Sequence, residues 1–339
     1  MYRLEKNGSK VAIFLGDIQV SSWFDVIYKD GLLSDESEYY IARKNNRVAI
    51  FKVVHQVTSK RVSDWFKSID PTGLVKNQSK YYVARNSKYY FLFREDSREP
   101  LAKSERYISI SGLVDGRSKY FVCQLDDGVA LFSEDNFKEP ISPLFRNIYA
   151  TEVLANELEY YIAVRVEDCA EFAIYSVKDK EPRSQWFDLI YTDVGLFKKQ
   201  SKYYIAYKDG QEAIFSIEDK DNPISLFWKD VSKEGLVSGT SDYYVAANKQ
   251  GFLAIFHKDD KENPKSQWLW NIRTDKGLLQ NESPYYLADN GKRDVVFHID
   301  DPHTIVADSS TPNYVLIVKG YYNIDQTRTA KSFKRTSCS

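Results

Sequence analysis

Serines are the residues whose repetition at fixed spacing first suggests chemistry in this sequence. One serine recurs two residues before an aromatic pair, at Ser37, Ser79, Ser118, Ser201, Ser241 and Ser283. A second serine opens an S-x-aromatic motif, at Ser21, Ser63, Ser184, Ser225 and Ser266, with degenerate copies at Ser104 and Ser142. A catalytic serine needs one base within hydrogen-bond reach rather than a series of equivalent copies. We therefore expect these hydroxyls to hydrogen-bond the backbone at turns.

One short segment gathers residue types that ligate metals. The sequence "HIDDPH" contains His298, Asp300, Asp301 and His303, and two imidazoles with two carboxylates can bind a divalent cation. The segment stands, however, where other repeats have an acidic, proline-bearing loop such as "SIEDKDNP" at 216–223. These loops lack the ligand spacing of an EF-hand. We expect a polar turn here and no cofactor.

No motif in the sequence indicates an enzyme. There is no phosphate-binding glycine loop, no dinucleotide fingerprint, no G-x-S-x-G and no H-E-x-x-H. The three cysteines, Cys123, Cys169 and Cys338, have neither zinc-ligand nor disulfide-framework spacing. Cys123 replaces an alanine of the repeat, so we expect it to be a small buried residue. Cys169 lies in a hairpin turn that is longer than its counterparts.

Composition narrows the classes of partner. Lys and Arg total 47 against 48 Asp and Glu, a net charge of −1, which gives no global field to attract nucleic acid or an anionic membrane. No segment has the length and apolarity of a signal peptide or a membrane span. These features predict a soluble cytoplasmic protein whose partner is another protein, with a small molecule or glycan as a possible ligand.

The serines belong to a longer repeat with a period of about 41 residues. Each unit has a Gly-Leu step, then a tyrosine pair eight residues later, then a "VAIF"-like run. The glycine falls at Gly31, Gly73, Gly112, Gly195, Gly235 and Gly277, with Glu152 in its place once. In one unit we expect a hairpin at 39–53, a third strand at 63–69 and a short fourth strand at 73–77.

Adjacent tyrosines point to opposite faces of a strand, so each pair demands bulk on both faces. A propeller blade, packed between two neighbouring blades, meets that demand. The same argument places the repeated Trp and Tyr residues in the core. We predict an all-β fold: one β-propeller of four-stranded repeats over 1–325, with units starting near 1, 39, 81, 120, 160, 203, 243 and 285.

We expect eight blades, with seven as the alternative. Two more strands, at 304–308 and 313–322, could close the ring beside the first or last hairpin. The basic segment 326–339 is expected to be a flexible tail. "FDVIYKDGLL" (24–33), followed by a hairpin, resembles bacterial WG-type β-repeats, although the Trp-Gly dipeptide of that family is missing. The resemblance implies a binding or scaffold role.

The positions where units differ are the candidate binding residues. If the strand after each tyrosine pair is innermost in a ring, the residues past its alanine lie at one mouth of a channel: Arg43, Arg85, Gln124, Arg165, Tyr207, Lys208, Asn248 and Asp289. Their arginines and lysine could bind an anionic or peptide group, or they could be solvated strand ends. We predict a non-catalytic protein-interaction scaffold. The alternative is a carbohydrate-binding or carbohydrate-active propeller that uses Tyr207, Trp228 or Trp270.

Overall fold

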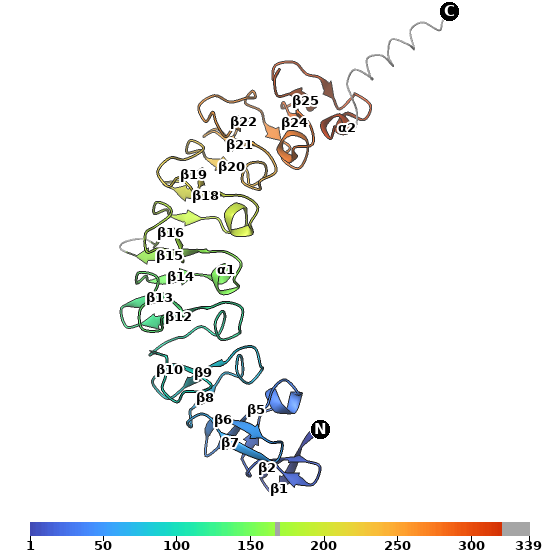
Figure 1. Cartoon of the computed structure of the whole chain (residues 1–339). Helices are drawn as coiled ribbons and strands as arrows, with labels where there is room; N and C mark the ends of the chain where they lie inside the picture. The colour runs from blue at the N-terminus through green and yellow to red at the C-terminus, as the bar shows by residue number, and fades with distance from the viewer. Residues whose placement is uncertain (167–169, 321–339) are drawn as a thin grey trace, which may run out of the picture. The chain divides into compact units, whose positions relative to one another are not determined.

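The computed structural model describes residues 1–166 and 170–320 of the chain. These residues form eight small antiparallel sheets of two to four strands each, numbered here in chain order (Figure 1). The chain divides into two compact units, the first of 1–166 with 174–181 and the second of the described residues of 167–173 and 182–339. The predicted all-β fold is confirmed. The prediction of one domain over 1–325 is not tested by this division.

Every sheet is built from consecutive strands. Sheet 1 contains β1 (Tyr2–Asn7), β2 (Lys10–Leu15) and β3 (Ile18–Gln19), and sheet 2 contains β4 (Val26–Ile27), β5 (Tyr39–Lys44), β6 (Arg47–Val54) and β7 (Thr58–Arg61). Sheet 3 contains β8 (Ser68–Ile69), β9 (Tyr81–Arg85), β10 (Tyr90–Arg94) and β11 (Ala102–Ser104), and sheet 4 contains β12 (Tyr120–Leu125) and β13 (Gly128–Ser133). Sheet 5 contains β14 (Asn147–Tyr149), β15 (Tyr160–Val166) and β16 (Ala170–Ser176), and sheet 6 contains β17 (Leu189–Ile190), β18 (Tyr203–Lys208) and β19 (Gln211–Ser216). Sheet 7 contains β20 (Asp230–Val231), β21 (Tyr243–Ala247) and β22 (Leu253–His257), and sheet 8 contains β23 (Asn271–Ile272), β24 (Tyr285–Asp289), β25 (Asp294–His298) and β26 (Ala307–Asp308).

The tyrosine pair serves both faces of its sheet, as the alternation of a strand requires. In sheet 2, Tyr40 packs into the core shared with sheet 1, and Tyr39 packs into the core shared with sheet 3. The second aromatic of each pair stacks on the last aromatic of the adjacent strand, as Tyr40 does on Phe51 with ring centroids 5.3 Å apart. The cores on the two faces of sheet 2 therefore lie between consecutive sheets, and the two-face prediction is confirmed.

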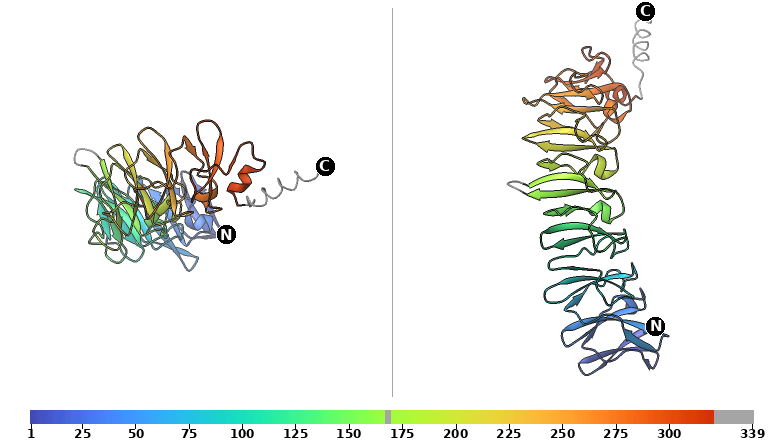
Figure 2. Two further views of the ribbon diagram at one scale, coloured as in Figure 1. Left: turned by 90° about the horizontal axis from the view of Figure 1, so that it is seen from above. Right: turned by 60° about the vertical axis from the view of Figure 1, so that its left-hand side comes forward.

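The Gly-Leu step was predicted to be a fourth strand, and this prediction is wrong. The step forms a turn or a short 3-10 helix, as in η1 (Gly31–Ser34), η2 (Gly195–Lys198) and η3 (Gly277–Gln280). Within each unit these turns lie at one end of the hairpins, and the hairpin tips lie at the other (Figure 2).

Glycine is required at this step for two reasons. Gly73 has φ +85°, and a Cβ there would lie 2.3 Å from the Tyr81 carbonyl oxygen. A side chain at this position would therefore be both strained and in collision with the backbone. Where Glu152 replaces the glycine, the chain forms a single α-helical turn instead, α1 (Thr151–Leu154).

The C-terminal strands were predicted only in part. Residues 307–308 form β26, which pairs with β25 within sheet 8. The segment expected to be a strand at 313–322 instead contains a short helix, α2 (Tyr314–Val318), so that prediction is wrong. In the part of the chain that the structure describes, no sheet combines strands from both ends of the sequence. Ring closure and the number of blades therefore stay predictions. The predicted tail at 326–339 lies outside the described residues.

Candidate binding site at the hairpin tips

Successive sheets are linked by a segment that contacts both of them. In sheet 2 the backbone of Val48 exchanges two hydrogen bonds of 2.9 Å with Phe66, and two residues later the chain enters β8 of sheet 3. The same bridge occurs at Val11↔Phe24, Val129↔Phe145, Phe172↔Phe187, Glu212↔Trp228 and Leu253↔Leu269. One residue closer to the hairpin tip than each bridge, the strand and the linking segment place two residues opposite each other as a cross-strand pair. We call this the step pair.

Two step pairs show that this geometry brings side chains into contact. In the first repeat Lys10 forms an ion pair with Asp25. In the seventh, the rings of Phe252 and Trp270 meet edge to face with centroids 5.0 Å apart. In the second repeat the step pair is Arg47 and Lys67, two cations at adjacent positions.

A groove opens beside this second step pair, in the first unit, and we call it the tip groove. It has a volume of about 670 Å³. Its walls are the tips of the β5–β6 and β9–β10 hairpins, and its floor is the segment that crosses from sheet 2 to sheet 3. The lining residues are Asn45, Asn46, Arg47, Asp64, Trp65, Phe66, Lys67, Asn86, Ser87, Lys88 and Tyr89.

Turn chemistry fixes the two walls. Asn45 and Asn46 have φ of 53° and 58°, the left-handed conformation of a two-residue hairpin turn that asparagine tolerates well. The side chain of Asn86 accepts hydrogen bonds from the backbone N–H groups of Lys88 and Tyr89 at 2.8 and 2.7 Å. Both tips are therefore held by their own asparagines, and the side chains between them are presented on rigid turns.

The tip groove carries excess positive charge. Arg47 and Lys67 are exposed, and among the described residues neither forms an ion pair. Lys88 pairs with Glu105 at 2.9 Å and lies 4.7 Å from the centre of the Tyr89 ring. Asp64 is the one acidic residue of the lining. The groove thus presents two uncompensated cations beside aromatic surface.

The predicted channel-mouth residues lie at the same ends of the hairpins. Arg43, Arg85, Gln124 and Arg165 lie near the ends of strands in the first unit, and Tyr207, Lys208, Asn248 and Asp289 occupy equivalent places in the second. Their convergence on one channel stays a prediction. The Arg85 guanidinium lies 4.7 Å from the centre of the Tyr90 ring. The side chains of Asn248 and Asp289 accept backbone hydrogen bonds in their own turns.

The repeated serines have structural roles, as predicted. Ser63 accepts a hydrogen bond from the Ile50 N–H at 2.8 Å and donates one to the Asp64 carbonyl at 2.9 Å. Ser79 accepts from the Tyr81 N–H at 3.1 Å and donates to the Val114 carbonyl at 2.6 Å. Ser63 fixes the segment that links sheets 2 and 3. Ser79 ties its repeat to the next one, as Ser37, Ser201 and Ser283 do in theirs.

The histidine segment forms a turn. His298 Nδ1 accepts a hydrogen bond of 3.2 Å from the Asp300 N–H, and its ring meets Tyr285 edge to face at 5.0 Å. His303 and Asp301 lie in the same turn region. Of the side chains that the structure describes, no group of three or more His, Cys, Asp and Glu is arranged to hold a metal ion.

Cys123 is buried, as expected, and burial raises the pKa of its thiol to about 11. Cys169 lies outside the described residues.

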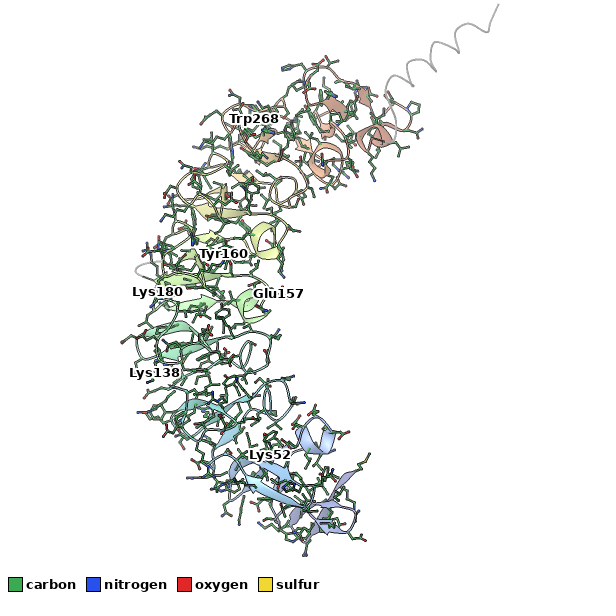
Figure 3. All side chains as sticks on the ribbon, in the orientation of Figure 1. Lys52, Lys138, Glu157, Tyr160, Lys180 and Trp268 are labelled. Atoms are coloured by element: carbon green, nitrogen blue, oxygen red, sulfur yellow. The ribbon has the colours of Figure 1, made fainter. Side chains whose placement is uncertain are left out.

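The prediction of core burial was correct for the second aromatic of each pair, held for the first tyrosine only at Tyr39 and Tyr81, and was wrong for the tryptophans. Tyr40, Tyr82 and Tyr244 are fully buried. In each Trp-Phe dipeptide the phenylalanine is buried, and Trp23, Trp65 and Trp186 are only half-buried. Trp268, which is labelled in Figure 3, is 39% exposed. Trp270, which was named for the carbohydrate alternative and not predicted to be in the core, is 64% exposed. Trp65 packs against the edge of the core that contains Phe51, with ring centroids 6.0 Å apart, and leaves part of its ring exposed.

Sequence inspection missed Glu212, the one charged residue among the described residues that is buried, with 8% of its surface exposed. Its carboxylate accepts hydrogen bonds from the Tyr191 hydroxyl at 2.5 Å and the Val231 N–H at 3.0 Å. Burial is the largest cause that raises the pKa of Glu212, and Asp230 adds to it. The sequence does indicate this residue, because "QEAIF" (211–215) places a glutamate where the second repeat has the buried Val48. Glu212 links sheets 6 and 7.

No family model and no curated protein matches the chain. The resemblance to WG-type repeats therefore stays a prediction. The described residues include no helix with the length and apolarity needed to cross a membrane.

Several solved structures resemble the chain weakly. A eukaryotic initiation factor has 13% identity and a TM-score of 0.33, over 91% of this chain and 85% of that one. BamB from Moraxella catarrhalis has 12% identity and a TM-score of 0.26, over 88% and 91%. Hsv2p of Kluyveromyces lactis has 9% identity and a TM-score of 0.28, over 69% and 75%. Likeness at this level supports no statement about ring closure or function.

Proposed function

We propose that the chain is a non-catalytic binding module that docks another protein at the hairpin tips of its repeats. The observation that carries this proposal is the uncompensated Arg47–Lys67 step pair in an open groove. The repeated serines support the non-catalytic part of the proposal, because the hydroxyls of Ser63 and Ser79 already form hydrogen bonds with the backbone. A rigid array of turns with variable tips suits recognition, since scaffolds commonly carry binding residues on loops.

Capture from native lysate tests the proposal. The wild-type chain and a variant with Asn46→Asp, Arg47→Ala and Lys67→Ala are immobilised, and bound proteins are identified and cross-linked. We expect a specific protein that is recovered by the wild type, lost by the variant and cross-linked near the tips. Lys138→Ala is the control, since this lysine lies on another loop (Figure 3). Recovery of no specific protein, or of one cross-linked elsewhere, would contradict the proposal.

A second candidate function is glycan binding, which the exposure of Trp270 favours. Its ring is 64% exposed and is supported from one side by Phe252, and exposed indoles stack on apolar faces of ligands. A glycan array compares the wild type with Trp270→Ala. Binding that disappears in the variant supports this candidate, and an array without signal removes it.

The eight-bladed ring is the finer part of the fold proposal, and small-angle scattering tests it. A compact chain of 339 residues has a radius of gyration of about 20 Å. A value near this supports a closed ring. A clearly larger value with an elongated distance distribution contradicts one.

A further inference from the structure

We propose that Arg47 and Lys67 form an anion clamp that binds a carboxylate of an acidic peptide segment lying in the tip groove. The inference deepens the proposed protein-binding function and rests on it.

The first argument is geometric. The hydrogen-bonded Val48↔Phe66 pair fixes the two backbones side by side, with N···O distances of 2.9 Å in both directions. Arg47 and Lys67 occupy the next positions outward, where cross-strand side chains are within reach of each other. The Lys10–Asp25 ion pair and the Phe252–Trp270 contact show that side chains at these positions do meet. The guanidinium and the ammonium can therefore bind one anion together.

The second argument concerns charge. Like charges directly opposite each other across a strand pair destabilise it, and no described carboxylate pairs with Arg47 or Lys67. The first repeat has the stabilising solution at the same positions, a lysine facing Asp25. The second repeat instead has Arg47 and Lys67 at these positions, and an anion bound between them would neutralise the repulsion between their positive charges. An arginine suits a carboxylate well, because its planar fork can donate two parallel hydrogen bonds.

The third argument selects a peptide as the occupant. The tip groove offers aromatic surface from Trp65 and Tyr89, and amide and carboxylate groups from Asn46, Asn86 and Asp64. Asp64 can accept the N–H groups of a peptide, whereas it repels a phosphate chain. Two free cations also fall short of the row of phosphate contacts that nucleic acids require.

The test uses a fluorescein-labelled octapeptide of alternating Asp and Gly, titrated with the full chain by fluorescence anisotropy. A Ser-Gly octapeptide and an eight-nucleotide oligothymidylate are titrated in parallel. We expect the acidic peptide to bind at low ionic strength and to weaken in 0.15 M salt, because the clamp is exposed. We expect the Ser-Gly peptide to bind at least tenfold more weakly. Oligothymidylate that binds more tightly than the peptide would overturn the choice of ligand.

Lys67→Asp is the decisive variant, because it recreates the ion pair of the first repeat. We expect it to weaken peptide binding at least tenfold while leaving the melting temperature unchanged or higher. Lys229→Asp is the matched control, since Lys229 holds the equivalent place opposite Gln211 in the second unit, and it should leave binding unchanged. Equal binding by Lys67→Asp and the wild type overturns the clamp, as does equal loss in the Lys229→Asp control.

The clamp and the proposed function fail separately. If a captured partner is retained by Lys67→Asp and the octapeptide does not bind, the clamp is wrong and the module stands. If the octapeptide binds through Lys67 and no protein is captured at the tips, the protein-binding function is wrong and the anion site stands.

Discussion

The Ser79 hydroxyl donates a hydrogen bond of 2.6 Å to the Val114 carbonyl, 35 residues further along the chain. The same oxygen accepts the Tyr81 N–H, so one small side chain fixes the start of its own strand and the turn of the next repeat. Ser79→Ala leaves both backbone groups without this partner. We expect the free energy of unfolding to fall by about 1–3 kcal/mol, measured by urea denaturation. The exposed Ser22 serves as control, and an equal effect of Ser22→Ala would contradict the interpretation.

Gly73→Ala should be much more damaging than Gly210→Ala, although both glycines have positive φ. A Cβ at Gly73 lies 2.3 Å from the Tyr81 carbonyl oxygen, and one at Gly210 meets nothing within 4 Å. The Gly210 change carries only the left-handed backbone cost of about 1–2 kcal/mol. The Gly73 change adds a backbone collision, and we expect a total loss above about 3 kcal/mol. Equal losses in chemical denaturation would show that the close approach to Tyr81 is unimportant.

The buried tyrosine hydroxyls provide a matched pair of substitutions. Tyr40 donates a hydrogen bond of 2.8 Å to Ser59, whereas the Tyr244 hydroxyl is buried without a partner among the described residues. Tyr40→Phe should lower the free energy of unfolding by about 1 kcal/mol, and Tyr244→Phe should leave it unchanged or raise it. Thermal and urea unfolding of the two variants measure the difference. The reverse order would mean that Tyr244 has a partner in solution.

Glu212 predicts a pH dependence of stability. Burial raises the pKa of Glu212 above its ordinary value of 4.5, so the folded chain binds this proton more tightly than the unfolded chain does. The stabilisation is fully present below the unfolded pKa and is lost as the pH rises through the folded pKa. Relative to Glu212→Gln, the wild type should lose stability as the pH rises from about 4.5 towards neutrality.

Urea denaturation at a series of pH values measures that difference. Glu99→Gln is the control, because Glu99 is exposed, and its curve should run parallel to the wild type. A wild-type curve parallel to that of Glu212→Gln would show that Glu212 does not titrate differently in the folded state.

Much of the local structure could be predicted from the repeat. The tyrosine pair indicated strands with two buried faces, and Tyr39 and Tyr40 do pack into different cores. The multiplicity of the serines indicated backbone bonds rather than catalysis, and Ser63 and Ser79 make such bonds. Both predictions rested on physical demands that a single strand must satisfy wherever it lies.

The errors arose where spacing alone cannot fix conformation. The Gly-Leu step is short and apolar, so its pattern fits a strand. In the structure Gly73 instead has a positive φ and lies against the Tyr81 carbonyl, a contact that the spacing of residues does not show. Half-burial of Trp65 depends on its packing against the edge of the core that contains Phe51, which spacing does not show. The Arg47–Lys67 juxtaposition also escaped prediction, because it needs the Val48↔Phe66 pairing across 18 residues to be known.

The sharing of each core between consecutive sheets has a consequence for cooperativity. Within each unit a sheet packs only against the sheets before and after it in the sequence. The free energy of unfolding is then approximately a sum of the stability of each sheet and of its interfaces with these neighbours, and folding proceeds from sheet to sheet. Sheet 4 has only two strands among the described residues, flanked by the isolated bridges Ile108↔Cys123 and Val129↔Phe145, which is the smallest number of strands in the first unit. Native-state hydrogen exchange should therefore begin at β12 and β13 and divide the unit there before the whole of it unfolds.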